Sequence, residues 1–355
     1  MLTVIGLMSG TSMDGIDAAL LRTDGEERVE PLTFLTIPYG DGFRSRLRSC
    51  LGGQGPVVEV ERELTEKHAD AVARLLEAAG LTADAIDLVG FHGHTILHAP
   101  AERRTWQIGN GALLARLTGI AVVDDFRTAD VSSGGEGAPL APLYHRALAA
   151  GLETPLAVLN LGGVGNLTWI GGDGSVIACD TGPGNALVDD WMLAHGGARF
   201  DAGGALAATG RVDGAALDAL LDNPYFDRPA PKSLDRDAFD TAPVQGLSPA
   251  DGAATLTAFT AAAVARAVAL LPEAPRRWLV TGGGRHNGTL MGMLGDRLGA
   301  PVVPVEDAGW DGDALEAQAF GYLAVRSRLG LPLSLPSTTG VPTPLTGGRF
   351  HPAGG

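Results

Sequence analysis

The decapeptide Met8-Ser9-Gly10-Thr11-Ser12-Met13-Asp14-Gly15-Ile16-Asp17 places glycines, hydroxyls and two carboxylates in one turn between two apolar runs. Glycine allows backbone conformations that are closed to other residues, and consecutive N–H groups in such a turn form a nest for an anion. The stretch therefore predicts a phosphate-binding turn in which Asp14 and Asp17 hold a metal ion through water. The alternative is an ordinary glycine-rich hairpin turn, which a short motif by itself favours.

The segments around this turn predict a hairpin and not a P-loop. A Walker A loop requires Gly-Lys-Ser/Thr and leads from a strand into a helix. This turn contains no lysine, and residues 16–22 have the pattern of a second strand. The rest of the chain must therefore decide between a ligand site and a structural turn.

The composition predicts an acidic protein of two domains. A chain of 355 residues exceeds the size at which one hydrophobic core usually stops growing. The formal net charge is -15, whereas binding to nucleic acid needs a concentrated basic face, so we expect no nucleic acid partner. An acidic protein that binds phosphates must neutralise them locally, through backbone dipoles and a divalent metal, and this fits a Mg-nucleotide.

Hydropathy and cysteine content predict a cytoplasmic protein with no membrane partner. No stretch reaches the roughly 18 uninterrupted apolar residues that a membrane-spanning helix needs. The N-terminus begins with an apolar strand and lacks the basic region and cleavage site of a secretory signal. The two cysteines, Cys50 and Cys179, lack the spacing of a metal site and agree with a reducing compartment.

Two segments are expected to complete the first domain. Val57–Ala79 has apolar residues at helical spacing with charges between them, which predicts a long amphipathic helix that Gly80 ends. The tail has too little apolar periodicity to fold alone, and we expect it to lie back across the first domain. The predicted domains are residues 1–127 with the tail 334–355, and residues 128–333.

Polar side chains follow two predicted strands of the first half. Residues 86–91 predict a buried strand that ends at His92-Gly93-His94, where α/β proteins bind ligands. Histidines two apart on an extended segment point in opposite directions, so a hydrogen-bonding or structural role is favoured over zinc. Arg127 lies at the seam before the Gly- and Ser-rich loop of residues 132–142, the best candidate for a domain boundary. Its guanidinium either meets a substrate carboxylate or pairs with Asp124 or Asp130.

The second half begins with the same strand, glycine turn, strand pattern as the first. Leu156–Leu161 and Leu167–Ile170 flank the turn Gly162-Gly163-Val164-Gly165-Asn166, which suggests two related domains facing one cleft. The next predicted strand delivers Asp180 at its end. The alternative is that Asp180 is a turn or capping residue, although Asn185 is better placed to cap the helix that follows.

Two later segments add candidate binding groups. The run Gly282-Gly283-Gly284 lies between a strand and a helix, where a flat ligand or a phosphate can lie against the backbone. In the last predicted helix, Glu316 and Phe320 are four residues apart and share a face, so Glu316 could face the predicted cleft.

Seven motifs occur in order along the chain. They are Gly6-Leu7-Met8-Ser9-Gly10-Thr11-Ser12-Met13-Asp14-Gly15-Ile16-Asp17, Trp106-Gln107-Ile108-Gly109-Asn110, Asp125-Phe126-Arg127, Asn160-Leu161-Gly162-Gly163, Asp180-Thr181-Gly182-Pro183-Gly184-Asn185, Gly282-Gly283-Gly284 and Glu316-Ala317-Gln318-Ala319-Phe320. Together they resemble the anhydro-N-acetylmuramic acid kinase family, nearly from end to end. The resemblance implies an α/β protein with the two-domain actin-like ATPase (ribonuclease H-like) fold and an interdomain cleft. The chain departs from the family's pattern at His94, where a glutamine is usual.

The resemblance implies an ATP-dependent kinase that converts 1,6-anhydro-N-acetylmuramic acid and water to N-acetylmuramic acid 6-phosphate in peptidoglycan recycling. Asp180 would be the general base that activates water against the anomeric carbon, while the freed O6 attacks the γ-phosphoryl group. The implied contacts to ATP come from Gly10, Thr11, Ser12, Met13, Asp14, Gly15, Asp17, Gly162, Gly163, Asn166, Gly282, Gly283 and Gly284. The implied contacts to the sugar come from Trp106, Asn110, Arg127, Gly182 and Glu316. Asp14 and Asp17 would hold Mg²⁺ through water, and we expect a homodimer.

Two other functions stay open at this stage. One is a kinase for another amino sugar or sugar on the same fold. The other is an ATP-switched binding or filament-forming protein, because a fold by itself does not assign a function.

Overall fold

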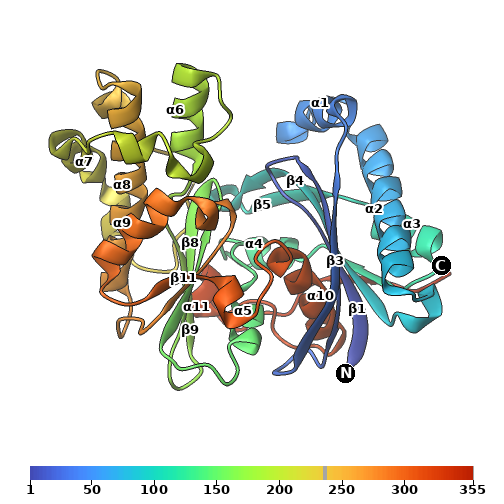
Figure 1. Ribbon diagram of the computed structural model, residues 1–355. Coiled ribbons are helices and arrows are strands. Elements are labelled where there is room, and N and C mark those ends of the chain that lie inside the picture. The colour runs from blue at the N-terminus through green and yellow to red at the C-terminus, as the bar shows by residue number, and fades with distance from the viewer. Residues whose placement is uncertain (235–237, 355) are drawn as a thin grey trace. The chain divides into compact units, whose positions relative to one another are not determined.

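The computed structural model describes residues 1–234 and 238–354, which form two compact units (Figure 1). Unit 1 contains residues 1–150 and the chain from residue 314 onward, and unit 2 contains residues 151–313. The division falls later than the predicted boundary after residue 127, and residues 314–333 also join unit 1. One cause is the buried hydrogen bond that the Tyr144 hydroxyl donates to Oε1 of Gln318, at 2.8 Å.

Unit 1 is built on a seven-stranded mixed sheet. Its strands are β1 (Leu2–Ser9), β2 (Gly15–Thr23), β3 (Val29–Pro38), β4 (Leu88–Ala99), β5 (Arg104–Ile108), β6 (Val122–Asp124) and β12 (Arg349–His351). The order is β12-β6-β4-β1-β2-β3, with β5 paired to β4. β1, β2 and β3 are antiparallel neighbours, whereas β4 runs parallel to both β1 and β6.

The helices of unit 1 are α1 (Asp41–Ser49), α2 (Val57–Ala79), α3 (Gly111–Thr118), α4 (Thr128–Ser132), α5 (Pro142–Leu148), α10 (Leu315–Arg328) and α11 (Pro336–Thr339). Among them, α2, α3, α4 and α10 pack on this sheet. The predicted long helix is α2, which ends at Gly80 in the left-handed conformation. Glycine is required where α10 meets β1, because a Cβ added at Gly6 would lie 1.8 Å from the carbonyl oxygen of Ala317.

Unit 2 repeats the strand order of unit 1 in a smaller sheet. Its strands are β7 (Leu156–Leu161), β8 (Val164–Ile170), β9 (Val176–Pro183), β10 (Trp278–Thr281) and β11 (Val302–Pro304), in the order β11-β10-β7-β8-β9. β7, β8 and β9 are antiparallel, and β10 runs parallel to β7 and β11. This arrangement matches β6-β4-β1-β2-β3 of unit 1, so the repeat that the two glycine hairpins suggest extends to five strands.

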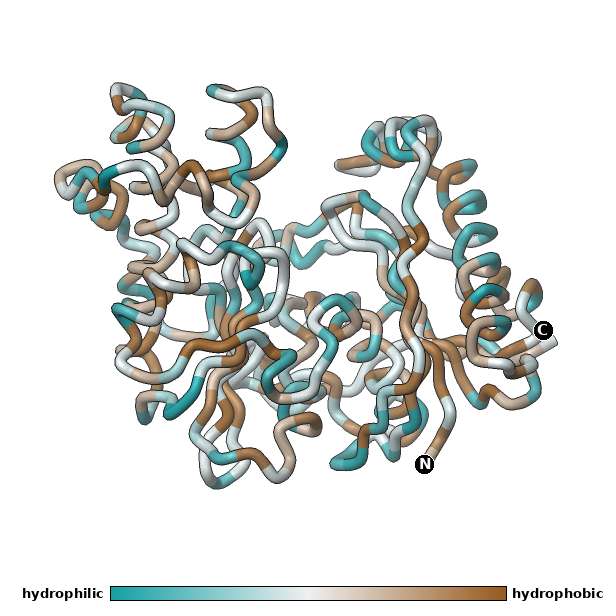
Figure 2. The backbone as a smooth tube through the Cα atoms, in the orientation of Figure 1, coloured by the Kyte–Doolittle hydropathy of each residue, from teal (hydrophilic) through white to brown (hydrophobic). Residues whose placement is uncertain are grey.

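Apolar residues follow the strands of both sheets, as Figure 2 shows. The longer helices of unit 2 are α6 (Ala186–Gly196), α7 (Gly214–Leu221), α8 (Pro249–Ala267) and α9 (Gly288–Leu298). Within the described residues, Pro249–Leu270 is long and apolar enough to cross a membrane, but 67% of its apolar window is buried inside the protein. Such burial is typical of a helix in the core of a folded protein.

The C-terminal tail is fixed to unit 1 by strand pairing and by one buried carboxylate. β12 pairs with β6 in antiparallel register, and the buried carboxylate of Asp124 accepts hydrogen bonds from both residues that flank the middle of β12. Arg349 donates through Nε at 3.0 Å and Nη2 at 3.1 Å, and Nε2 of His351 lies at 3.0 Å. The backbone N–H of Gly111 also donates to this carboxylate, so one aspartate joins three segments.

Candidate active site

The predicted phosphate-binding turn connects β1 to β2 as a hairpin. The Met13 N–H donates to the Gly10 carbonyl at 3.0 Å, and Met13 adopts a positive φ of 55°. Thr11 and Ser12 are exposed, and their N–H groups donate no hydrogen bond within the described part of the chain. Exposed N–H groups beside hydroxyls are the donors that a phosphate oxygen requires.

The two glycines of the turn have different surroundings. A Cβ at Gly10 would meet only the Ser12 hydroxyl, at 3.4 Å, so the backbone there is open to a ligand. A Cβ at Gly15 would lie 2.4 Å from the Ile37 carbonyl, so Gly15 is required for the pairing of β2 with β3. The expectation that both glycines serve close approach to a ligand therefore fits Gly10 alone.

The two carboxylates of the turn fit water-mediated Mg²⁺ binding. Asp14 is exposed and accepts a hydrogen bond from the Ser12 hydroxyl at 2.8 Å, while Asp17 accepts one from Thr36 at 2.6 Å. Mg²⁺ prefers oxygen ligands, keeps several waters and takes other ligands from substrate phosphates. Residues 1–234 and 238–354 contain no group of three or more His, Cys, Asp or Glu side chains placed to hold a metal ion directly.

A buried polar chain supports the turn from behind, which the sequence did not predict. The Tyr39 hydroxyl donates to the Ser9 hydroxyl at 2.8 Å, and Ser9 contacts Nδ1 of His94 at 3.1 Å. The Tyr39 N–H also donates to the Asp14 carbonyl at 2.8 Å. Tyr39 therefore contacts residues at both ends of the turn.

The sequence predicts His92 and His94 beyond the end of a strand. In the structure both lie inside β4. The predicted strand stops too early because Gly93, with a φ of 71°, interrupts the apolar pattern without ending the strand. Nε2 of His92 accepts a hydrogen bond from Nε of Arg127 at 3.0 Å, and its Nδ1 donates to the Gly93 carbonyl at 2.9 Å. Burial and the Arg127 charge hold the pKa of His92 well below its usual value, so the ring is neutral and can accept this bond.

Arg127 is held by these neutral partners. Its Nη1 donates to the Gly137 carbonyl at 2.6 Å, and its guanidinium lies over the Phe320 ring at 5.8 Å. Burial lowers the pKa of Arg127 to about 10, which the charges of Glu316 and Asp130 partly oppose. From one face of α10, the exposed Glu316 thus raises the pKa of Arg127 by its charge, and the buried Phe320 contacts the guanidinium with its ring.

The predicted alternative for Arg127, an ion pair with Asp124 or Asp130, does not form. Asp124 pairs with the C-terminal strand, as described above. The Asp130 carboxylate accepts from the Gly137 N–H at 2.7 Å and from the Thr339 hydroxyl at 2.6 Å. These bonds fix the loop that supplies the carbonyl partner of Arg127.

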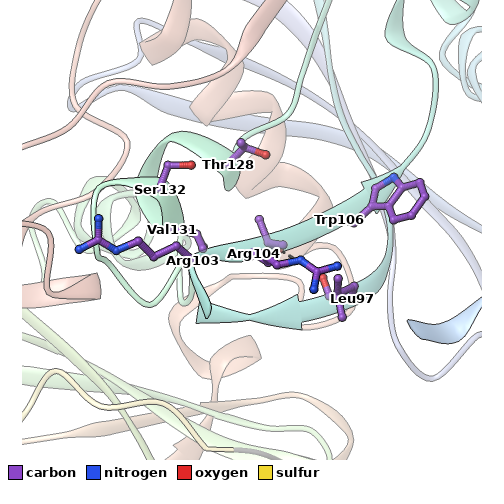
Figure 3. A pocket seen from close by; sticks show the side chains of 8 residues that line it. Leu97, Arg103, Arg104, Trp106, Thr128, Val131 and Ser132 are labelled. Atoms are coloured by element: carbon purple, nitrogen blue, oxygen red, sulfur yellow. Dashed lines mark hydrogen bonds between the residues drawn. The ribbon is translucent and has the colours of Figure 1, made fainter. Parts of the chain in front are cut away.

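Trp106 borders a pocket of about 240 Å³ in unit 1 (Figure 3). Trp106 is 42% exposed. Figure 3 shows Arg104 and Trp106 on β5 and Thr128 and Ser132 on α4, next to Arg127 in the sequence. Asn110, predicted to contact the sugar, caps α3 by accepting from the Leu113 N–H at 2.8 Å.

In unit 2, three glycine segments meet at one edge of the sheet. β7 and β10 are parallel with Asn160 opposite Thr281, so the loops that follow them emerge at the same edge. A Cβ at Gly282, which has a φ of 73°, would lie 2.3 Å from Oδ1 of Asn160. A Cβ at Gly284 would lie 2.5 Å from Cβ of Leu161, whereas Gly283 is open.

Asn185 joins these segments, but not as a helix cap. Its Nδ2 donates to the carbonyls of Leu161 and Gly162 at 2.7 and 3.2 Å, and its side chain makes no capping bond to α6. The N–H groups of Gly184 and Asn185 donate to the carbonyls of Gly163 and Gly162. The glycine hairpin and the start of α6 are therefore one rigid unit.

The sequence predicts Asp180 at the end of a strand. In the structure it lies within β9, because β9 continues to Pro183. The turn or capping interpretation of Asp180 is therefore wrong. Asn166, predicted in the glycine turn, lies within β8 opposite both Asn160 and Asp180, so three polar side chains cross the sheet in one row. The sequence pattern predicts β8 and β9 too short because glycines and polar residues occur inside these strands.

The Asp180 carboxylate is oriented by a segment that the sequence left without a role. Its Oδ2 accepts from the Leu234 N–H at 2.8 Å, and its N–H donates to the Lys232 carbonyl at 2.9 Å. The Tyr225 hydroxyl donates to the Asp180 carbonyl at 2.8 Å. Lys232, one of two lysines in the chain, is buried and donates through Nζ to the Tyr225 carbonyl at 2.9 Å.

Two predicted contacts differ in exposure. Gly182 is buried, and a Cβ there would lie 2.7 Å from Cβ of Ala263, so its glycine is required for packing against α8. Gly163 is exposed at the tip of the hairpin. Gly163 therefore has the exposure that a ligand contact needs, and Gly182 does not have it.

The repeated sheets and the glycine hairpin that opens each unit define the actin-like ATPase and sugar kinase class. A solved structure, component A of (R)-2-hydroxyglutaryl-CoA dehydratase from Acidaminococcus fermentans, matches 92% of this chain and 99% of its own at a TM-score of 0.50. At 13% identity this likeness shows the fold alone. The family model described as anhydro-N-acetylmuramic acid kinase matches residues 2–353.

Two relatives, both named anhydro-N-acetylmuramic acid kinase, match over nearly the whole chain. The relative from Paramagnetospirillum magneticum is 62% identical over 98% of this chain and 99% of its own. The relative from Rhodospirillum rubrum is 61% identical over 98% of this chain and 94% of its own. The chain belongs to the anhydro-N-acetylmuramic acid kinase family, and the resemblance predicted from its motifs is confirmed.

Proposed function

We propose that this protein uses ATP to convert 1,6-anhydro-N-acetylmuramic acid and water into N-acetylmuramic acid 6-phosphate. The full-length family match carries this proposal. The reaction balances as follows: water adds to C1, the C1–O6 bond breaks, O6 takes the γ-phosphoryl group, and ADP leaves. The water proton passes to a carboxylate.

We assign the role of general base to Asp180. A carboxylate base must be held in one orientation to act on a bound water. The hydrogen bond from the Leu234 N–H to Oδ2 and the two backbone contacts of Asp180 supply that orientation.

We assign the phosphates of ATP to the β1–β2 turn and the nucleotide to the glycine segments of unit 2. The exposed N–H groups of Thr11 and Ser12 would bind phosphate oxygens, and the open backbone at Gly10 and Gly283 would allow close approach. Mg²⁺ held through water by Asp14 and Asp17 would neutralise the phosphate charge, which phosphoryl transfer requires.

We assign the sugar to Arg127, Glu316 and Trp106. Arg127 presents a cation whose position His92 and Gly137 fix, suited to the lactyl carboxylate of the sugar. Trp106 offers an exposed ring beside a pocket. We also propose that the protein works as a homodimer in the cytoplasm, which sedimentation velocity and cell fractionation would test.

The test compares Asp180→Asn with Asp173→Asn. An asparagine at 180 can still accept from the Leu234 N–H, so the variant keeps the fold while it loses the base. Asp173 lies in the exposed β8–β9 turn of the same sheet and provides a matched control. With Mg-ATP and the anhydro sugar, we expect phosphorylated product from the wild type and Asp173→Asn and none from Asp180→Asn. Product formation by Asp180→Asn at the wild-type rate would remove the assignment.

A kinase for another sugar is the second candidate, because the same fold can carry a kinase for either substrate. Faster phosphorylation of N-acetylmuramic acid or glucose than of the anhydro sugar would favour it. ATP turnover with filament formation and no phosphorylated sugar would instead favour a non-metabolic ATP-switched protein.

A further inference from the structure

Two imidazole nitrogens behind the phosphate-binding turn have no hydrogen-bond partner. Among the described residues, Nε2 of His68 and Nε2 of His94 are buried and unpaired. Both side chains are 0% exposed, so bulk water does not reach them. A buried polar atom without a partner is costly, and native proteins contain few of them.

The two rings lie in the same part of the core. The His68 ring, on α2, lies 4.8 Å from the ring of Phe91 on β4. His94 is three residues further along β4. The two imidazoles also interact electrostatically, because charge on His94 would lower the pKa of His68 further. The unpaired nitrogens therefore belong to one region between α2 and β4.

The protonation of His68 follows from its other nitrogen. Its Nδ1 lies 2.7 Å from the Leu64 carbonyl oxygen, which can only accept a hydrogen bond. Nδ1 must therefore carry the proton. Burial lowers the pKa of His68 to about 4, so the ring is neutral at pH 7 and its Nε2 presents a lone pair.

The protonation of His94 is the opposite. The Ser9 hydroxyl accepts a hydrogen bond from the Tyr39 hydroxyl, and its own O–H can then donate to Nδ1 of His94. Burial lowers the pKa of His94 to about 4, so this ring is neutral as well. With Ser9 as the donor to Nδ1, the single proton of this ring is on Nε2. The two unpaired atoms are therefore one donor and one acceptor.

We propose that Nε2–H of His94 donates to Nε2 of His68, directly after a small ring rotation or through one buried water, and that the resulting chain positions the phosphate-binding turn. The chain runs Tyr39 to Ser9 to His94 to His68 to the Leu64 carbonyl, with every donor pointing the same way. Ser9 is the last residue of β1 and precedes the turn. His68, on α2, is then a positioning residue for the nucleotide, an assignment that rests on the proposed function of the turn.

The chain itself is tested on the wild-type protein, without any variant. Two-dimensional ¹⁵N–¹H spectra of ¹⁵N-labelled histidines at pH 7 distinguish the two neutral tautomers. We expect Nε2–H at His94, with slow exchange against solvent, and Nδ1–H at His68. A proton on Nδ1 of His94, or a charged ring at either position, would overturn the proposal.

The positioning role is tested by nucleotide binding and turnover of His68→Phe. This variant keeps a ring against Phe91 and removes the acceptor, and we expect Mg-ADP affinity and the KM for ATP to weaken about tenfold, as for one orphaned buried donor. His94→Gln, which keeps one donor and one acceptor, should lose less than His94→Leu. His195→Phe, on the exposed end of α6, is the control and should match the wild type.

The outcomes separate this proposal from the proposed function. Wild-type affinity and KM in a folded His68→Phe protein would overturn the positioning role. If that variant does not fold, the order of His94→Gln and His94→Leu decides instead. The expected tautomers in a protein that binds no nucleotide would support the hydrogen-bond chain and contradict the nucleotide site.

Discussion

Replacing His92 with phenylalanine should weaken sugar binding without dismantling the fold. The substitution keeps a ring 4.4 Å from Phe320 but removes the acceptor for Nε of Arg127, which it contacts at 3.0 Å. A hydrogen bond to a charged group contributes about 1.5–3 kcal/mol. The Gly137 carbonyl still holds Nη1, so we expect the lower part of this range.

A loss of about 1.5–2 kcal/mol corresponds to a roughly 10- to 30-fold weaker interaction. Because Arg127 is assigned to the sugar and not to ATP, the KM for the anhydro sugar should rise by this factor while the KM for ATP stays constant. Steady-state kinetics with each substrate varied in turn measures both, with His195→Phe as the control. An unchanged KM for the sugar, or an equal rise in both KM values, would refute the reasoning.

Further predictions concern stability and reactivity. Asp124→Asn places an amide donor against Arg349 and should lower the free energy of unfolding, measured by urea titration, by about 1–3 kcal/mol. The loss stays in this range because Arg349 is exposed to solvent. A decrease below about 0.5 kcal/mol would contradict the role of Asp124 in attaching the C-terminal strand. His68 and His94 have pKa values near 4 in the folded protein, against about 6.5 when unfolded. The unfolded state therefore binds more protons below pH 6.5, so stability should be constant above that pH and fall steadily towards pH 4; a flat profile between pH 6.5 and 4 would contradict burial of neutral rings. Burial raises the pKa of the Cys179 thiol to about 12, so iodoacetamide at pH 8 should label it only after unfolding, and rapid labelling of native protein would show that it is accessible.

The sequence predicted elements whose pattern is local. The helix over Val57–Ala79 has regular apolar spacing and a glycine end, and both glycine hairpins lie between clear apolar runs. The resemblance added the fold class, because no single hairpin distinguishes a ligand site from a structural turn. Together these signals sufficed for the family.

The sequence could not predict contacts between distant segments. Strands β4 and β9 were ended too early because Gly93 and Asp180 break the apolar pattern while backbone pairing continues. The Tyr39 hydroxyl donates to Ser9, and the Lys232 carbonyl accepts from the Asp180 N–H, so both depend on partners tens of residues away. Their signals were weak: one was a tyrosine after a strand, and the other was one of only two lysines.

The predicted boundary at residue 127 rested on composition alone. A Gly- and Ser-rich loop often marks a linker, but here it carries the Gly137 carbonyl that fixes Arg127 and the N–H that binds Asp130. Loop composition reports local backbone freedom and not the hydrogen bonds that a folded loop makes. The unit therefore continues to residue 150.

The most direct test of the central claim is the mass of the product formed in ¹⁸O-water. Purified protein is incubated with 1,6-anhydro-N-acetylmuramic acid and Mg-ATP, and the product is analysed by mass spectrometry. The account predicts N-acetylmuramic acid 6-phosphate with one ¹⁸O at C1, and no such product from Asp180→Asn. A phosphorylated sugar without the label, or a product whose anhydro ring is intact, would contradict it.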